Sequence, residues 1–114
     1  MFAKLKPLVA AAMLLCASAA AVSADYGFNI TNETDHTITS MYVSPAESEY
    51  WEENLLGDYG ALRPGKTKRV RLSGYENPIF DIRLVDEEDD RYTFWKVDVS
   101  TEDITVRPDD MDDD

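Results

Sequence analysis

The sequence predicts an all-β fold, a small antiparallel β-sandwich of the immunoglobulin-like type with six or seven strands. Three observations support this prediction. Short segments with apolar residues at every second position recur along the chain, clusters of turn-forming residues separate them, and a single segment resembles the start of a helix. A small open barrel is the alternative that the same pattern allows.

The first half of the chain contains two predicted strands and the predicted helix. Residues 26–30 carry apolar groups at alternate positions, and residues 36–43 are rich in the β-branched residues that favour strands. Ser44 and Pro45 follow, and Ser directly before Pro is typical of a helix start. We therefore expect one short helix or helical loop near residues 46–56.

The second half of the chain contains four further predicted strands. In the longest of them Trp95, Val97 and Val99 share parity, so we expect all three side chains on one face. Two-sided apolar patterning favours a central position in a sheet for this strand and for the strand that contains Phe80. The four strands cover residues 66–73, 78–85, 91–99 and 102–106.

The first 24 residues resemble a secretory signal. Lys4 and Lys6 make the start positive, an apolar run follows, and the segment ends in small residues up to Ala24. The apolar run is short for a membrane helix, which needs about 20 residues, and no charged stop-transfer segment follows it. We therefore expect cleavage after Ala24, no stable membrane insertion afterwards, and a periplasmic or secreted protein.

Cleavage would leave 90 residues, which is enough for a single domain. We expect this domain to cover residues 25–108, and we expect residues 109–114 to form a disordered acidic tail. The whole chain has a net charge of −12, and the loss of Lys4 and Lys6 makes it −14. A field of this sign argues against nucleic acid as a partner and favours a basic protein.

Several short motifs follow one another in a fixed order, from Tyr42-Val43-Ser44-Pro45 through Trp51 and Leu55-Leu56-Gly57 to Leu62-x-Pro64-Gly65. Together they resemble a family of small secreted bacterial proteins of unassigned function. The resemblance extends to about Val106 and implies an exported β domain without catalytic residues. Some members carry the label argininosuccinate lyase, an activity whose site lies between subunits of a large helical oligomer. A β domain of this size cannot supply such a site.

The chain departs from this family where members often carry a pair of cysteines. Pro78 and Ser100 stand at these two places. The resemblance therefore implies a disulfide that this chain lacks. The only cysteine, Cys16, lies within the predicted signal, so the mature domain must be stable without any thiol.

Residues suited to catalysis are scarce. Nucleophilic catalysis needs a nucleophile, a base and an orienting group, and His36 is the only histidine. Its place beside Asp35 is typical of a solvated turn residue. We predict that the protein is not an enzyme and needs no cofactor.

One turn is a candidate calcium site, because it gathers the hard oxygen ligands that calcium prefers. Its spacing does not match the usual calcium loop, and it contains no glycine to make the sharp turn. A solvated acidic turn is therefore the favoured interpretation, and calcium binding is the alternative. The turn consists of Asp86, Glu87, Glu88, Asp89 and Asp90.

Two sets of residues are candidate contacts with a partner. One is a group of aromatic residues with acidic neighbours, which fill the core in the alternative interpretation. The other, Ser73-Gly74-Tyr75, loosely resembles a loop that some lysozyme inhibitors insert. We predict a non-catalytic exported binding protein, with an inhibitor of a basic cell-wall hydrolase or a calcium-binding module as alternatives. The candidate contacts are Tyr50, Trp51, Tyr59, Ser73, Gly74 and Tyr75.

The one basic stretch contains Lys66, Lys68, Arg69 and Arg71. We interpret it as a strand whose exposed cations pair across the sheet with acids such as Asp81, and anion binding is the alternative.

Two Asn-x-Thr sequences begin at Asn29 and Asn32. The bacterial character of the signal indicates turn and strand-end residues rather than sites of glycosylation.

Overall fold

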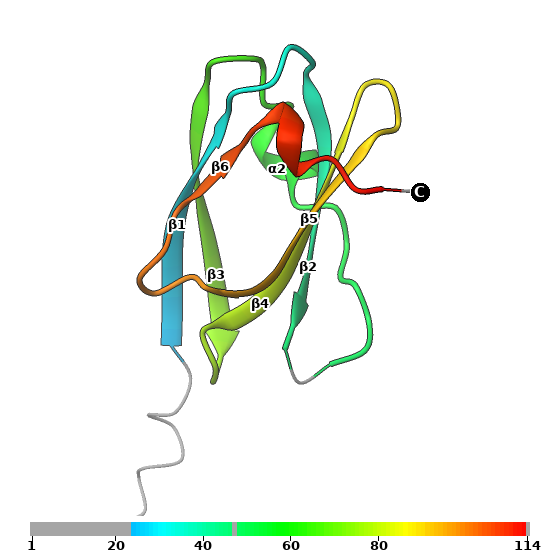
Figure 1. Ribbon diagram of the computed structural model, residues 1–114. Helices are drawn as coiled ribbons and strands as arrows, with labels where there is room; N and C mark the ends of the chain where they lie inside the picture. The colour runs from blue at the N-terminus through cyan, green and yellow to red at the C-terminus, as the bar shows by residue number, and fades with distance from the viewer. Residues whose placement is uncertain (1–23, 47, 114) are drawn as a thin grey trace, which may run out of the picture.

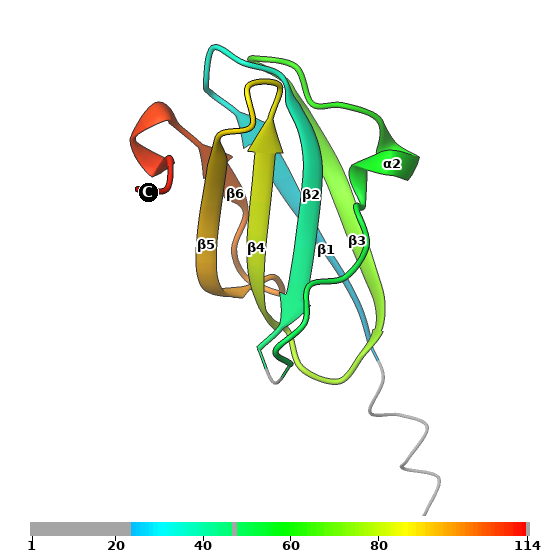
Figure 2. The same cartoon turned by 90° about the vertical axis from the view of Figure 1, so that its right-hand side faces the viewer.

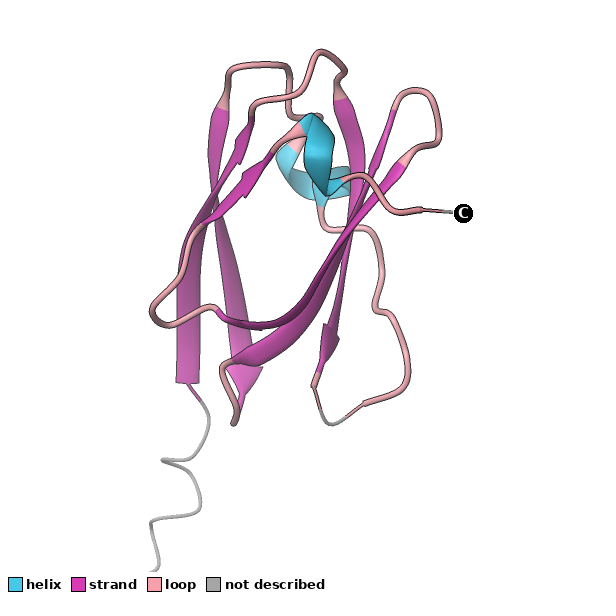
Figure 3. Cartoon of the chain, in the orientation of Figure 1, coloured by secondary structure: helices cyan, strands magenta, loops and turns pink. Residues whose placement is uncertain are grey.

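A computed structural model describes residues 24–46 and 48–113. Six strands form two three-stranded sheets that lie face to face as two layers (Figure 1). The predicted fold class, a small all-β sandwich, is confirmed. The strands are β1 (Ala24–Asn32), β2 (Ile38–Pro45), β3 (Thr67–Tyr75), β4 (Ile79–Asp86), β5 (Arg91–Asp98) and β6 (Ile104–Val106), and the short helices are α2 (Leu56–Tyr59) and η2 (Pro108–Asp110) (Figure 3).

The predicted signal falls outside the described residues, except for Ala24, with which β1 begins. In the part of the chain that the structure describes, no helix has the length and apolar character needed to cross a bilayer.

The two sheets differ in strand direction. One has the order β2-β4-β5 and is antiparallel throughout, and the other has the order β3-β1-β6. Figure 2 shows the first sheet in front of the second. The β1–β6 pair runs parallel, with Ile30 opposite Ile104, because the chain leaves β5 and crosses to the other sheet at the end where β1 starts. The prediction of antiparallel strands therefore holds for every described strand pair except this one.

The core lies between the two sheets, and β4 shows how the sequence directs it there. Buried and partly exposed residues alternate along the whole of β4, with Phe80, Ile82 and Leu84 fully buried. On the facing sheet Phe28 and Val70 are also fully buried. Burying each of these side chains contributes about 1.5 to 3 kcal/mol. The predicted central position of the Phe80 strand is confirmed.

The alternation breaks in β5, because a β-bulge inserts one extra residue. The register against β4 shifts between Phe94 and Val97, and Lys96 has a φ of 54°. As a result Val97 faces the core together with Tyr92, although the two residues differ in parity. Trp95 faces outward and is 62% exposed. The prediction that Trp95 shares a face with Val97 is therefore wrong. Because β5 lies at the edge of the β2-β4-β5 sheet, the prediction that this strand is central is also wrong.

The segment after β2 runs along the free edge of that strand. The backbone N–H of Glu52 donates to the carbonyl of Val43, and that of Leu55 donates to the carbonyl of Met41, both at 2.8 Å. These bonds satisfy edge groups that would otherwise invite another strand. They hold the segment in an extended form, so the helix starts only at Leu56, at the end of the predicted region 46–56.

The C-terminal segment covers the free edge of β5 in the same way (Figure 2). The N–H of Asp112 donates to the carbonyl of Arg91 at 2.7 Å, and the N–H of Thr93 donates to Oδ1 of Asp112 at 2.8 Å. The prediction of a disordered tail at 109–114 is therefore corrected for residues 109–113. The acidic composition of this segment favours solvation. The free edge of β5, however, donates hydrogen bonds from Thr93 that the carboxylate of Asp112 accepts.

Candidate functional site

The acidic turn of residues 86–90 joins β4 to β5 at one end of the sandwich (Figure 2). Asp86 is 1% exposed and points inward. Its Oδ1 accepts the backbone N–H groups of Glu88 and Asp90 at 2.8 and 3.1 Å, and its Oδ2 accepts the hydroxyl of Tyr92 at 2.9 Å. Asp86 therefore caps its own turn with one carboxylate oxygen and binds the side chain of Tyr92 on β5 with the other.

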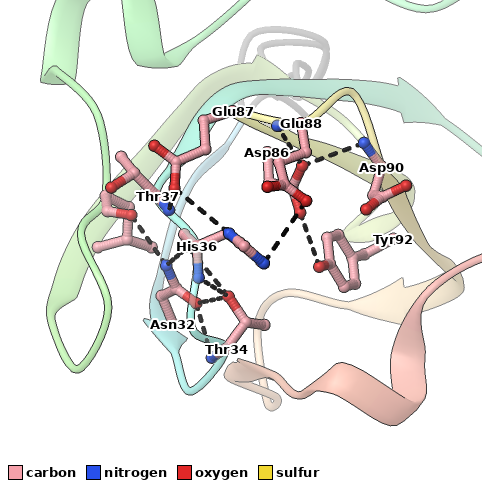
Figure 4. A network of polar contacts seen from close by, with 10 residues as sticks. Asn32, Thr34, His36, Thr37, Asp86, Glu87, Glu88, Asp90 and Tyr92 are labelled. Atoms are coloured by element: carbon pink, nitrogen blue, oxygen red, sulfur yellow. Dashed lines mark hydrogen bonds and ion pairs between the residues drawn. The ribbon is translucent and has the colours of Figure 1, made fainter.

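His36 faces the exposed carboxylates of the same turn (Figure 4). Its Nδ1 lies 3.4 Å from Glu87 Oε2, and its Nε2 lies 3.7 Å from Glu88 Oε1. Burial lowers the pKa of His36. The acidic neighbours Glu88, Glu87 and Asp86 together raise this pKa by more than burial lowers it, so the pKa lies above its ordinary value. Asp89 is exposed and has a φ of 65°. Across the described ranges, no group of three or more acidic, histidine or cysteine side chains converges as metal ligands would.

Beside this turn, Asn32 lies at the centre of a buried polar network (Figure 4). Asn32 is fully buried, and its Nδ2 donates to the carbonyls of His36 and Leu62 at 2.7 and 3.0 Å. Its Oδ1 accepts the backbone N–H and the hydroxyl of Thr34 at 2.9 and 2.7 Å. All the polar capacity of this side chain is used within the fold, which supports its interpretation as a strand-end residue.

The predicted inhibitor loop, Ser73-Gly74-Tyr75, forms the end of strand β3. The ring of Tyr75 packs edge-on against Phe80 with the ring centroids 4.9 Å apart. Its hydroxyl donates a hydrogen bond to Glu52. Tyr75 therefore stabilises the sandwich instead of projecting from it. Tyr59 is also engaged, since its hydroxyl accepts the backbone N–H of Arg71 at 3.3 Å.

Two tyrosines make the fold sensitive to high pH. Burial and the bond to Glu52 raise the pKa of Tyr75 to about 12, and burial together with Asp86 raises the pKa of Tyr92. The folded state thus holds both phenolic protons more tightly than the unfolded state does. Their contribution to stability is complete below an ordinary tyrosine pKa of about 10 and is lost as the pH rises toward the folded values.

We therefore expect the melting temperature, followed by circular dichroism, to fall between about pH 10 and pH 12. The fall should be shallower in Tyr75→Phe, which has no proton to lose at this position. An equal fall in the variant would contradict this cause.

The outer surface of the β2-β4-β5 sheet carries a tryptophan face, defined here as Trp51, Arg83 and Trp95. The two indole rings lie 6.3 Å apart between centroids, at an angle of 56°. The guanidinium carbon of Arg83 lies 4.6 Å from the centre of the Trp51 ring, which is cation–π distance. Tyr50, next to Trp51 in the chain, is 79% exposed. The two most exposed rings of the described residues, Tyr50 and Trp95, therefore lie beside and on this sheet.

A chain of hydrogen bonds holds Arg83 in place from the C-terminal segment. Nε of Arg83 donates to Oγ1 of Thr93 at 3.0 Å, and the same hydroxyl donates to Oδ2 of Asp112 at 2.5 Å. Because Asp112 also accepts the N–H of Thr93, its carboxylate fixes the side chain of Thr93 in the rotamer that accepts the hydrogen bond from Arg83. The C-terminal segment thus helps to build the tryptophan face.

Of this face, the sequence predicted Trp51 alone as a contact. The sequence does contain a signal for the outward position of Trp95. Tyr92 and Phe94 are large apolar residues of the opposite parity, so a strand that buries them turns Trp95 toward solvent. Nothing in the local pattern pointed to Arg83 or Asp112. Their roles depend on strands that meet only in the folded protein.

The basic stretch does not pair as predicted. Lys68, Arg69 and Arg71 lie on β3, whereas Asp81 lies on β4 in the other sheet. Oδ1 of Asp81 accepts the backbone N–H of Lys96 at 2.8 Å, within the bulge of β5. The prediction that these cations pair with Asp81 across a shared sheet is therefore wrong.

Two surface hollows lie among the described residues, of about 410 and 350 Å³, and charged residues make up at least half of the lining of each. The larger lies beside Asp89, Asp90 and Arg91, and the smaller lies between β5 and β6. His36 lines neither of them, so they do not bring a histidine base to a nucleophile.

Comparisons with known proteins add little. No family model and no curated protein matches the chain. One solved structure, the NMR structure of a protein from Eubacterium rectale, is similar to this chain with 13% sequence identity and a TM-score of 0.42. The alignment covers 73% of this chain and 75% of the Eubacterium rectale chain. A similarity this distant carries no argument about function. The resemblance to the secreted bacterial family stays a prediction.

Proposed function

We propose that the protein is a non-catalytic, exported binding module that holds a basic protein partner against its tryptophan face. The observation that carries this proposal is the exposure of Trp95, at 62%, beside the Trp51 ring. Large aromatic side chains that a soluble domain leaves exposed together mark interaction surfaces more often than scattered apolar residues do. The predicted signal supports export.

A basic partner fits this face for two reasons. The chain has 23 acidic and 11 basic residues, and Glu49 and Glu53 are exposed close to Trp51 in the sequence. Such a field speeds the encounter with cations. Arg83 also demonstrates that a guanidinium stacks on Trp51, and the exposed ring of Trp95 offers the same chemistry to a Lys or Arg of a partner.

Intrinsic fluorescence gives a direct test, because the chain contains two tryptophans and both belong to the tryptophan face. Titration with poly-L-lysine, which has no tryptophan, should change the emission in a saturable way. The affinity should fall as salt rises. Trp95→Ala should weaken binding about tenfold, as expected when a central aromatic contact is removed.

Tyr59→Ala provides the matched control, since this exposed ring lies on α2 and contacts β3 of the other sheet. Its affinity should equal that of the native protein. Poly-L-glutamate should produce no change in emission. The proposal fails if Trp95→Ala binds poly-L-lysine as tightly as the native protein does.

A further inference from the structure

The outer surface of the other sheet, β3-β1-β6, carries two neighbouring arginines. Arg69 and Arg71 are both exposed and, two positions apart on β3, point to the same side of the sheet. Opposite them on β1 lie Asn29 and Gly27, respectively. This surface belongs to the layer away from the tryptophan face (Figure 2).

The side chain of Arg69 leans along the sheet toward the position of Arg71. A Cβ added to Gly27, the residue opposite Arg71, would lie 2.9 Å from Nη2 of Arg69. The guanidinium of Arg69 therefore lies on the bare backbone at Gly27, and its Nη1 donates to Oδ1 of Asn29 at 3.4 Å. The fold thus moves one cation toward another and anchors it through a neutral amide.

Among the described residues, neither arginine forms an ion pair. In the described segments, ion pairs join His36 to Glu87 and Glu88, and Arg107 to Glu33. Arg69 and Arg71 take part in none of them, although acidic residues outnumber basic ones by 23 to 11. Two neighbouring guanidiniums that form no ion pair repel each other, and an anion held between them would remove this repulsion.

A small hollow of about 140 Å³ lies at this place and is lined by Gly27, Arg69 and Arg71, among other residues. Because Gly27 has no side chain, the guanidinium of Arg69 lies flat against its backbone, and the two arginines supply planar N–H donors suited to an oxyanion. Asp25 also lines the hollow, and its negative charge disfavours an anion of high charge. We propose that the hollow binds one singly charged tetrahedral oxyanion, of the kind found in a sulfate monoester or a phosphate diester.

Nuclear magnetic resonance of the full domain tests this site through the amide of Gly27. Methyl sulfate and dimethyl phosphate should each shift this signal saturably, with dissociation constants of about 1 mM. Sodium chloride at the same ionic strength should not. Comparing the two ligands distinguishes a sulfated from a phosphorylated source, and tighter binding of one assigns the site to that source.

Three variants make the result decisive. Arg71→Gln should weaken binding at least about tenfold. Asp25→Asn should strengthen binding, because it removes the opposing charge. Arg63→Gln changes an exposed arginine that does not line the hollow and should have no effect. An equal shift with chloride, a shift that never saturates, or native affinity in Arg71→Gln would overturn the proposal.

The site is independent of the proposed binding of a basic partner. Trp95→Ala should therefore leave the Gly27 titration unchanged.

Discussion

Asn32→Asp is expected to lower the free energy of unfolding by about 3 kcal/mol or more. The native Nδ2 donates to the carbonyls of His36 and Leu62. Aspartate would place a carboxylate oxygen against these two carbonyl oxygens in a fully buried position. Two hydrogen bonds would be lost, and a charge would be buried without a donor on that side.

Urea unfolding followed by tryptophan fluorescence measures this change. Asn29→Asp is the matched control, because Asn29 is only partly buried and its Oδ1 accepts a bond from Arg69 that a carboxylate would retain. The control should change the free energy of unfolding by less than about 0.5 kcal/mol. Equal losses in the two variants would contradict the structural role assigned to Asn32.

Asp86→Ala is expected to cost about 3 kcal/mol of stability. The substitution leaves the backbone N–H groups of Glu88 and Asp90 and the buried hydroxyl of Tyr92 without their acceptor. Two of these donors are part-buried and the hydroxyl is buried, so leaving them unmatched costs more than exposing the same donors to water.

Glu88→Ala is the control within the same turn. Glu88 is exposed and contacts His36 at 3.7 Å, so its removal should change stability by less than about 0.5 kcal/mol in urea unfolding. Equal stability of the two variants would show that Asp86 is not the cap of the turn. Calcium that raises the melting temperature of the native protein, but not of Asp86→Ala, would restore the metal interpretation of this turn.

The strands of the sandwich could be located from the sequence because alternation is a local property. A residue such as Ile82 reveals its orientation through its neighbours two positions away, and the facing sheet need not be known. The same reasoning failed at Trp95. A bulge changes parity inside a strand, and the bulge here depends on how β5 pairs with β4.

The tail shows a second limit of local reasoning. Composition indicated that residues 109–114 would remain in solvent, because they contain almost no apolar side chains. Composition gives no information about an unpaired strand edge elsewhere in the fold. Asp112 finds that edge on β5 and, through Thr93, orients Arg83 on the tryptophan face.

The amino-acid sequence by itself determined the strands, the apolar core and the strong negative charge of this protein. Each of these follows from residue type and from spacing over a few positions. The tertiary structure alone decided which polar groups meet. It buried Asn32 as a donor to the carbonyl of Leu62, brought Arg83 over Trp51, and placed the guanidinium of Arg69 against Gly27, the residue opposite Arg71. Contacts of this kind form between segments far apart in the chain, and the register and facing of the sheets select them.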